Sequence, residues 1–136
     1  MSTTNRVVGW IDSRRRPLIN LRVSPDRTVS AVVDTGFNGY LLWEGTPTNL
    51  SDFPGELSAL YESVEVAGGQ ILAALATMPI QWFAEGAYTS FETLVALSDK
   101  RHRPGDPMVF VGTALLSGKM LVIDFTEETV RIQRST

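Results

Sequence analysis

Residues 29–37 read Val-Ser-Ala-Val-Val-Asp-Thr-Gly-Phe, an apolar, β-branched run that ends directly in Asp34-Thr35-Gly36. The run predicts a buried strand. A carboxylate placed directly after such a strand is costly unless it is paired or functional. The Thr35 hydroxyl and the following backbone amides can hydrogen-bond that carboxylate and orient it, and Gly36 allows the backbone to turn sharply. The stretch therefore predicts either a functional carboxylate or an ordinary turn.

The turn is the simpler interpretation, because Asp and Gly are common turn residues. An Asp-Thr-Gly tripeptide arises by chance in roughly 2 to 3% of chains of this length, at usages of about 5 to 7% per residue type. The tripeptide alone is weak evidence, so the residues around it must decide between the two interpretations.

Outward from this stretch, short apolar segments alternate with turn residues in both directions. They predict strands at residues 7–11, 18–23, 29–33, 40–43, 77–83, 91–97, 108–111, 120–125 and 129–132. A Gly-Gly pair between two β-prone arms predicts a hairpin over residues 64–72. Apolar spacing predicts short helices at residues 57–61 and 113–116. The sum is an all-β fold, barrel-like or sandwich-like, with one or two short helices.

Length and composition narrow the class of protein. The 136 residues fit a single domain over residues 1–136. The absence of cysteine excludes disulfides and thiolate metal sites. A net charge of −3 offers no basic surface for nucleic acid or a membrane. Residues 1–6 lack an apolar secretory segment, and no apolar run is long enough to span a bilayer, so a cytoplasmic protein is expected.

The single histidine, His102, lies in a polar loop between basic residues and is expected to be solvated. One imidazole without cysteine leaves few metal ligands and argues against Ser-His-Asp chemistry. We therefore expect no metal and no cofactor. Three tryptophans, Trp10, Trp43 and Trp82, are expected in the core.

In this pattern the chain resembles the retropepsin-like aspartic proteases, and is similar to the prokaryotic single-domain members that carry Asp-Thr-Gly-Phe. The resemblance covers about residues 7–132. Three segments match in the family's order. They are the strand into Asp34-Thr35-Gly36-Phe37, a hairpin over Ala67, Gly68, Gly69 and Gln70 where the family has its flap, and Phe110-Val111-Gly112, which in the family lies beside the Asp-bearing loop.

The resemblance implies a small closed acid-protease barrel with one or two short helices and an aspartic endopeptidase activity. Two carboxylates must share one proton in such a site, since like charges a few ångströms apart cannot both ionise. The ionised carboxylate acts as general base on a water, and the protonated one hydrogen-bonds the scissile carbonyl. Because the chain has one Asp-Thr-Gly, the resemblance implies a homodimer with two facing Asp34 side chains. Thr35 and Gly36 would support the loop, and the hairpin would close over a peptide or protein substrate.

Two departures from the retroviral pattern matter. Phe37, a large group near the expected cleft, stands where those members usually have Ala. Asn38 and Thr113 stand where they carry an acid and an Arg whose ion pair supports the dimer. Two hypotheses follow: a peptidase that cuts near apolar side chains, or a catalytically silent dimeric module for peptide binding or assembly.

Overall fold

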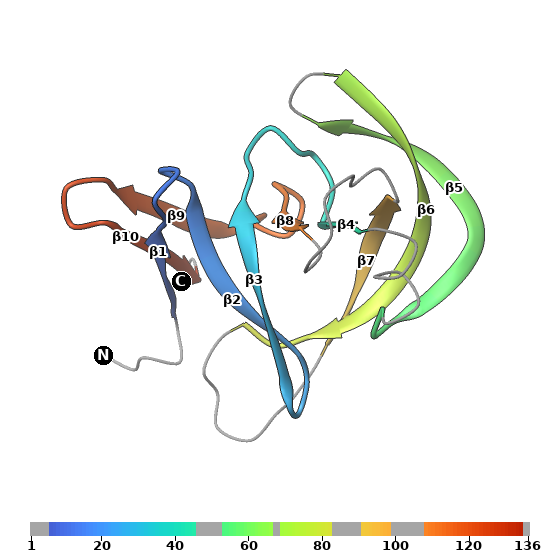
Figure 1. Ribbon diagram of the computed structural model, residues 1–136, viewed down its shortest axis with the longest axis horizontal. Coiled ribbons are helices and arrows are strands. Elements are labelled where there is room, and N and C mark those ends of the chain that lie inside the picture. Colours follow the sequence, from blue (N-terminus) through green and yellow to red (C-terminus); the bar gives the residue numbers. More distant parts are fainter. Residues whose placement is uncertain (1–5, 46–52, 67–68, 83–90, 99–107, 135–136) are drawn as a thin grey trace.

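The computed structural model describes residues 6–45, 53–66, 69–82, 91–98 and 108–134, and this part of the chain is all-β (Figure 1). It contains ten strands and no helix. The strands are β1 (Arg6–Ile11), β2 (Pro17–Ser24), β3 (Arg27–Val33), β4 (Leu41–Glu44), β5 (Glu56–Val66), β6 (Gly69–Ile80), β7 (Phe91–Ser98), β8 (Met108–Val111), β9 (Lys119–Asp124) and β10 (Thr129–Arg134). Consistent with this, no helix capable of crossing a membrane occurs in the described segments.

All ten strands belong to one mixed sheet in the order β5-β6-β7-β4-β8-β3-β2-β1-β10-β9. β8 is inserted between β3 and β4, parallel to β3 and antiparallel to β4. β4 and β7 form the second parallel pair. Because β8 lies beside β3 and runs parallel to it, the connection that follows β3 and the connection that follows β8 start at the same end of these two strands. The Asp34 loop is one of these two connections.

The sheet curls strongly, but its two end strands do not pair to close it, so the expected closed barrel is not confirmed. β5 and β9 are its two ends and do not pair with each other. An isolated bridge joins Arg22 of β2 to Gln81, the residue after β6, through hydrogen bonds of 2.8 Å and 2.7 Å. This bridge brings the end of β6 back against β2, as Figure 1 shows at the bottom of the molecule.

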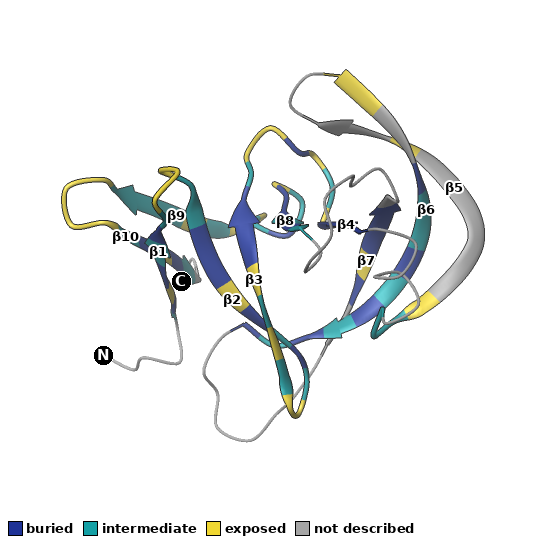
Figure 2. Cartoon of the chain, in the orientation of Figure 1, coloured by how far each residue is buried: buried dark blue, intermediate teal, exposed yellow. Residues whose placement is uncertain are grey.

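The buried residues of the core lie along the strands of this curled sheet, with buried stretches on β2, β3 and β7 (Figure 2). Strands near the Asp34 loop are buried on both faces: Ala31, Val32 and Val33 are buried in succession, as are Leu41, Leu42 and Trp43. Consecutive buried residues are typical of strands covered on both sides. Of the three tryptophans expected in the core, Trp43 and Trp82 are buried and Trp10 is half-buried.

Both predicted helices are wrong. Residues 57–61 lie in β5, which pairs with β6 and has a register irregularity between Leu57 and Tyr61. Such an irregularity offsets the strand's two-residue period, and the resulting apolar spacing mimics a helix over a short segment. Residues 113–116 form consecutive turns closed by bonds such as Leu116 N to Thr113 O (3.2 Å), and Gly118 follows at φ 74°. The expected strand at 77–83 also differs, because β6 runs unbroken from Gly69 to Ile80.

Candidate functional site

Asp34 lies at the point where β3 leaves the core. Val33 before it is buried, Asp34 is half-buried, and Thr35 and Gly36 are exposed. The Asp34 amide donates to the Val111 carbonyl of β8 at 2.9 Å, which holds the start of the loop against the neighbouring strand. The loop therefore starts from a rigid position and presents its next two residues to solvent.

The Asp34 carboxylate is oriented by its own loop. The Gly36 amide donates to Asp34 Oδ1 at 2.9 Å, and the Phe37 amide donates to the Asp34 carbonyl at 3.2 Å. A backbone amide that donates to a carboxylate oxygen restricts the rotation of that carboxylate. Among the residues that the structure describes, Asp34 has no ion pair, so no cation neutralises this carboxylate.

The turns after β8 hold the second half of the Asp34 loop through backbone hydrogen bonds. Gly112 N donates to Tyr40 O at 2.9 Å, Thr113 N to Phe37 O at 2.9 Å and Ala114 N to Gly39 O at 3.1 Å. Val111 and Gly112 thus contact the loop through their backbones. Their part in catalysis stays a prediction.

Phe37 is buried, and the expectation that it would be a large group near the cleft is only partly met. Its side chain is 1% exposed and packs with Leu42, Ala73 and Ala96, a small cluster apart from the main core. Only a small part of the ring is left to contribute to the wall of a neighbouring cavity. Sequence reasoning missed this burial, although Gly39 two residues later was an available signal for a nearby bulky group.

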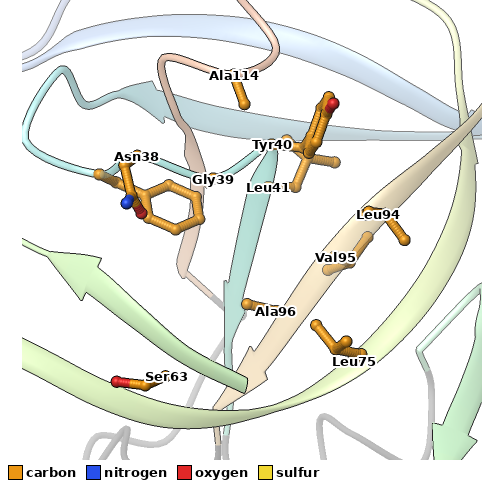
Figure 3. A pocket seen from close by; sticks show the side chains of 11 residues that line it. Asn38, Gly39, Tyr40, Leu41, Ser63, Leu75, Leu94, Val95, Ala96 and Ala114 are labelled. Atoms are coloured by element: carbon orange, nitrogen blue, oxygen red, sulfur yellow. The ribbon is translucent and has the colours of Figure 1, made fainter. Parts of the chain in front are cut away.

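A cavity of about 220 Å³ adjoins the Asp34 loop. Figure 3 shows residues 38–41 on one side of it and Leu75 and Leu94 on another. Polar and apolar atoms contribute about equally to its surface, and its lining consists of Phe37, Asn38, Gly39, Tyr40, Leu41, Ser63, Leu75, Leu94, Val95, Ala96 and Ala114. Two of these residues, Tyr40 and Leu94, are large and exposed, at 43% and 49%. The sequence did not reveal this cavity, because its walls come from five separate segments.

The hairpin expected to act as a flap consists of β5 and β6, which pair as far as Val66 and Gly69. Gly69 and Gln70 are exposed at the start of β6, whereas Ala67 and Gly68 lie outside the described residues. The connected ends of β5 and β6 and the loop after β3 lie toward the same side of the molecule (Figure 1). Ser63 of β5 also lines the cavity, so this hairpin borders the cavity beside the Asp34 loop.

Other chemistry finds little support in the part of the chain that is described. No cluster of three His, Cys, Asp or Glu side chains there could hold a metal ion. His102 lies outside the described residues. Comparison with known proteins found no matching family model, no matching curated protein and no matching solved structure. The function must therefore be argued from the geometry around Asp34.

Proposed function

We propose that this chain is an aspartic endopeptidase that works as a homodimer, with one Asp34 from each subunit in a shared site. One observation carries the proposal. An oriented carboxylate without an ion pair in the described structure lies at the end of a buried strand, in a loop whose later residues, Phe37 to Tyr40, line a cavity. The exposed residues Thr35 and Gly36 leave this side of the loop open to a second copy. The finer fold, a closed retropepsin-like barrel, is part of the proposal, and the Arg22–Gln81 bridge supports it.

Two Asp34 carboxylates at hydrogen-bonding distance would share one proton. The ionised carboxylate takes a proton from water as the water oxygen attacks the peptide carbonyl carbon. The protonated carboxylate gives its proton to the carbonyl oxygen, which yields a tetrahedral gem-diol. The first carboxylate then protonates the amide nitrogen, a gem-diol hydroxyl proton returns to the second carboxylate, and the C–N bond breaks. The products are a carboxylic acid and an amine, and the pair regains its starting state.

The substrate that fits this site is an extended peptide with an apolar side chain near the cut. The cavity beside the loop would take that side chain, because Leu75, Leu94 and Val95 form its apolar wall. The β5–β6 hairpin would add main-chain hydrogen bonds to the extended peptide and exclude water above it. A cytoplasmic site of action stays a prediction.

The test is Asp34→Asn, which keeps the shape of the side chain and removes the acid–base function. We expect the variant to keep the wild-type melting temperature and to lose peptide cleavage by at least about 10³-fold. Cleavage is measured by mass spectrometry on a library of apolar peptides from acidic to neutral pH.

The matched control is Asp26→Asn, since Asp26 is an exposed turn carboxylate that accepts a hydrogen bond from Ser24 Oγ (2.8 Å). It should cleave at the wild-type rate. Cleavage by Asp34→Asn at the wild-type rate would overturn the proposal. Peptide binding without any cleavage by the wild type would instead support the silent binding module.

A further inference from the structure

We infer that Phe37 is a positioning residue whose ring wedges the Asp34 loop into place between Gly39 and Gly112. Its catalytic consequence rests on the proposed peptidase function, whereas its effect on the loop can be measured without any catalysis. Phe37 does this through two linked features, the fit of its ring and the hydrogen bonds of its backbone.

The ring fits a space that two glycines leave open. A Cβ added at Gly39 would lie 2.6 Å from Phe37 Cζ and 2.8 Å from Phe37 Cε1, and the nearest atoms to it all belong to the Phe37 ring. A Cβ added at Gly112 would lie 2.6 Å from Phe37 Cδ2. Both distances are far inside van der Waals contact. The ring is therefore held on two sides, by its own loop and by the turn after β8.

The ring also connects the loop to the sheet behind it. Phe37 forms a cluster with Leu42 of β4, Ala73 of β6 and Ala96 of β7, and Phe110 of β8 packs against this cluster. The two alanines leave room for one large group, and Phe37 is the largest member of this cluster. Because β6 is an arm of the β5–β6 hairpin, the same side chain links the Asp34 loop to that hairpin.

The backbone of Phe37 passes this restraint on to Asp34. The Phe37 carbonyl accepts hydrogen bonds from Thr113 N (2.9 Å) and Thr113 Oγ1 (3.4 Å), and the Phe37 amide donates to the Asp34 carbonyl. Gly36, between the two residues, donates to the Asp34 carboxylate. A shift of Phe37 therefore displaces the carboxylate that must meet its copy across the dimer.

The expected effect of Phe37→Ala is a fall in kcat of about 10²-fold with a smaller change in KM, since a displacement near 1 Å at a reacting group can cost that much. Two carboxylates that move apart also interact less, so the pH range of activity should narrow. Leu21→Ala is the matched control, because Leu21 is fully buried in the main core away from the loop. It should lower the melting temperature but leave kcat and the width of the pH profile unchanged.

The Gly39→Ala variant makes the test specific to the ring. Alone it should reduce kcat, because its methyl group pushes the ring and hence the loop. Combined with Phe37→Ala it should cause little further loss, since the atoms that its Cβ would meet are gone. Equal losses from Gly39→Ala in both backgrounds would contradict the wedge.

An NMR measurement without substrate separates this inference from the proposed function. In the wild type the Gly36 amide proton should shift with pH in NMR spectra as Asp34 titrates, because it donates to that carboxylate. Phe37→Ala should reduce this shift at least about twofold, and Leu21→Ala should retain it. If the wild type does not cleave peptides but Phe37→Ala still reduces the shift, the peptidase proposal fails and the positioning role stands. If the wild type cleaves and Phe37→Ala alters neither kcat nor the Gly36 titration, the positioning role is overturned.

Discussion

At the scale of single residues, the local hydrogen bond of Asp34 does not by itself distinguish a catalytic carboxylate. Asp12 Oδ1 accepts the Arg14 and Arg16 amides at 2.9 Å each, and Asp124 Oδ1 accepts the Thr126 amide at 2.9 Å. All three carboxylates lie at the ends of strands and shape turns. Asp34 differs in its surroundings. The later residues of its loop, Phe37 to Tyr40, line the cavity, and among the described residues Asp34 has no ion pair, whereas Asp12 is paired with Arg16 at 2.8 Å.

Gly112 packs so closely against the Asp34 loop that a larger residue would not fit at its position. A Cβ there would lie 2.2 Å from the Gly39 carbonyl oxygen, a backbone atom that cannot rotate away. We expect Gly112→Ala to lower the free energy of unfolding by about 1–3 kcal/mol, the usual cost of forcing an extra methyl group into a packed site. Denaturant unfolding measures the loss. Ser117→Ala, on the exposed end of the same turns, should change stability little, and similar stability of the two variants would contradict the close packing at Gly112.

At the scale of elements, two hairpin turns support each other at one end of the sheet. Arg15 of the β1–β2 turn contacts Glu128 of the β9–β10 turn at 3.2 Å and donates to the Phe125 carbonyl at 3.3 Å. Both Arg15 and Glu128 have positive φ, at 64° and 57°. These ionic contacts are exposed and contribute little individually. Arg14, Arg15 and Arg16 are consecutive in this β1–β2 turn, and the Arg16 side chain pairs with Asp12.

The Asp12 carboxylate makes this turn sensitive to pH. The pKa of Asp12 lies below its ordinary value of 3.8, chiefly because the Arg16 amide donates to the carboxylate. Desolvation opposes this effect, and the Arg16 guanidinium and the Arg14 amide lower the pKa further. A lowered pKa in the folded state stabilises the protein above the unfolded value, and this contribution disappears as the pH falls through the folded value. Asp12→Asn should therefore lower the melting temperature at pH 7.

That difference in melting temperature should shrink as the pH falls below about 4 and through the lowered pKa of Asp12, because the wild-type carboxyl then loses its charge. Thermal melts of both proteins across this range measure it. Asp26→Asn serves as the control, because Asp26 belongs to neither ion pair of the described structure. If the melting temperatures of the wild type and Asp12→Asn differ by the same amount from pH 7 to pH 2, the charge of Asp12 does not contribute to stability.

At the scale of the whole molecule, one chain holds half of the proposed site. The described part of the chain presents the Asp34 carboxylate in a loop that lines a cavity, and in the proposed site the second carboxylate comes from another copy. The extent of the single domain over residues 1–136 stays a prediction. Activity should accordingly depend on the concentration of the protein, because dilution separates the two halves.

Mixing subunits tests this dependence directly. Equal amounts of wild type and Asp34→Asn, allowed to exchange, should leave about one quarter of the dimers with two functional carboxylates. Activity should fall to about half of that of the same amount of wild type alone. Mixing with Asp26→Asn should not reduce it. An unchanged activity in the Asp34→Asn mixture, once exchange has been shown by mass spectrometry, would place the whole site within one chain.

The sequence by itself determined most of the strands and the location of Asp34 after a buried one. Alternating or β-branched segments and turn residues act over a few neighbours, so β1 to β4 and β7 to β10 were predicted within a few residues of their bounds. Tertiary structure alone decided that residues 57–61 are a strand, since pairing with β6 overrides their helical spacing. It also decided the insertion of β8 between β3 and β4, the burial of Phe37 and the cavity. Each of these depends on contacts such as that between Phe37 and Thr113, residues so distant in the chain that no local pattern specifies their meeting.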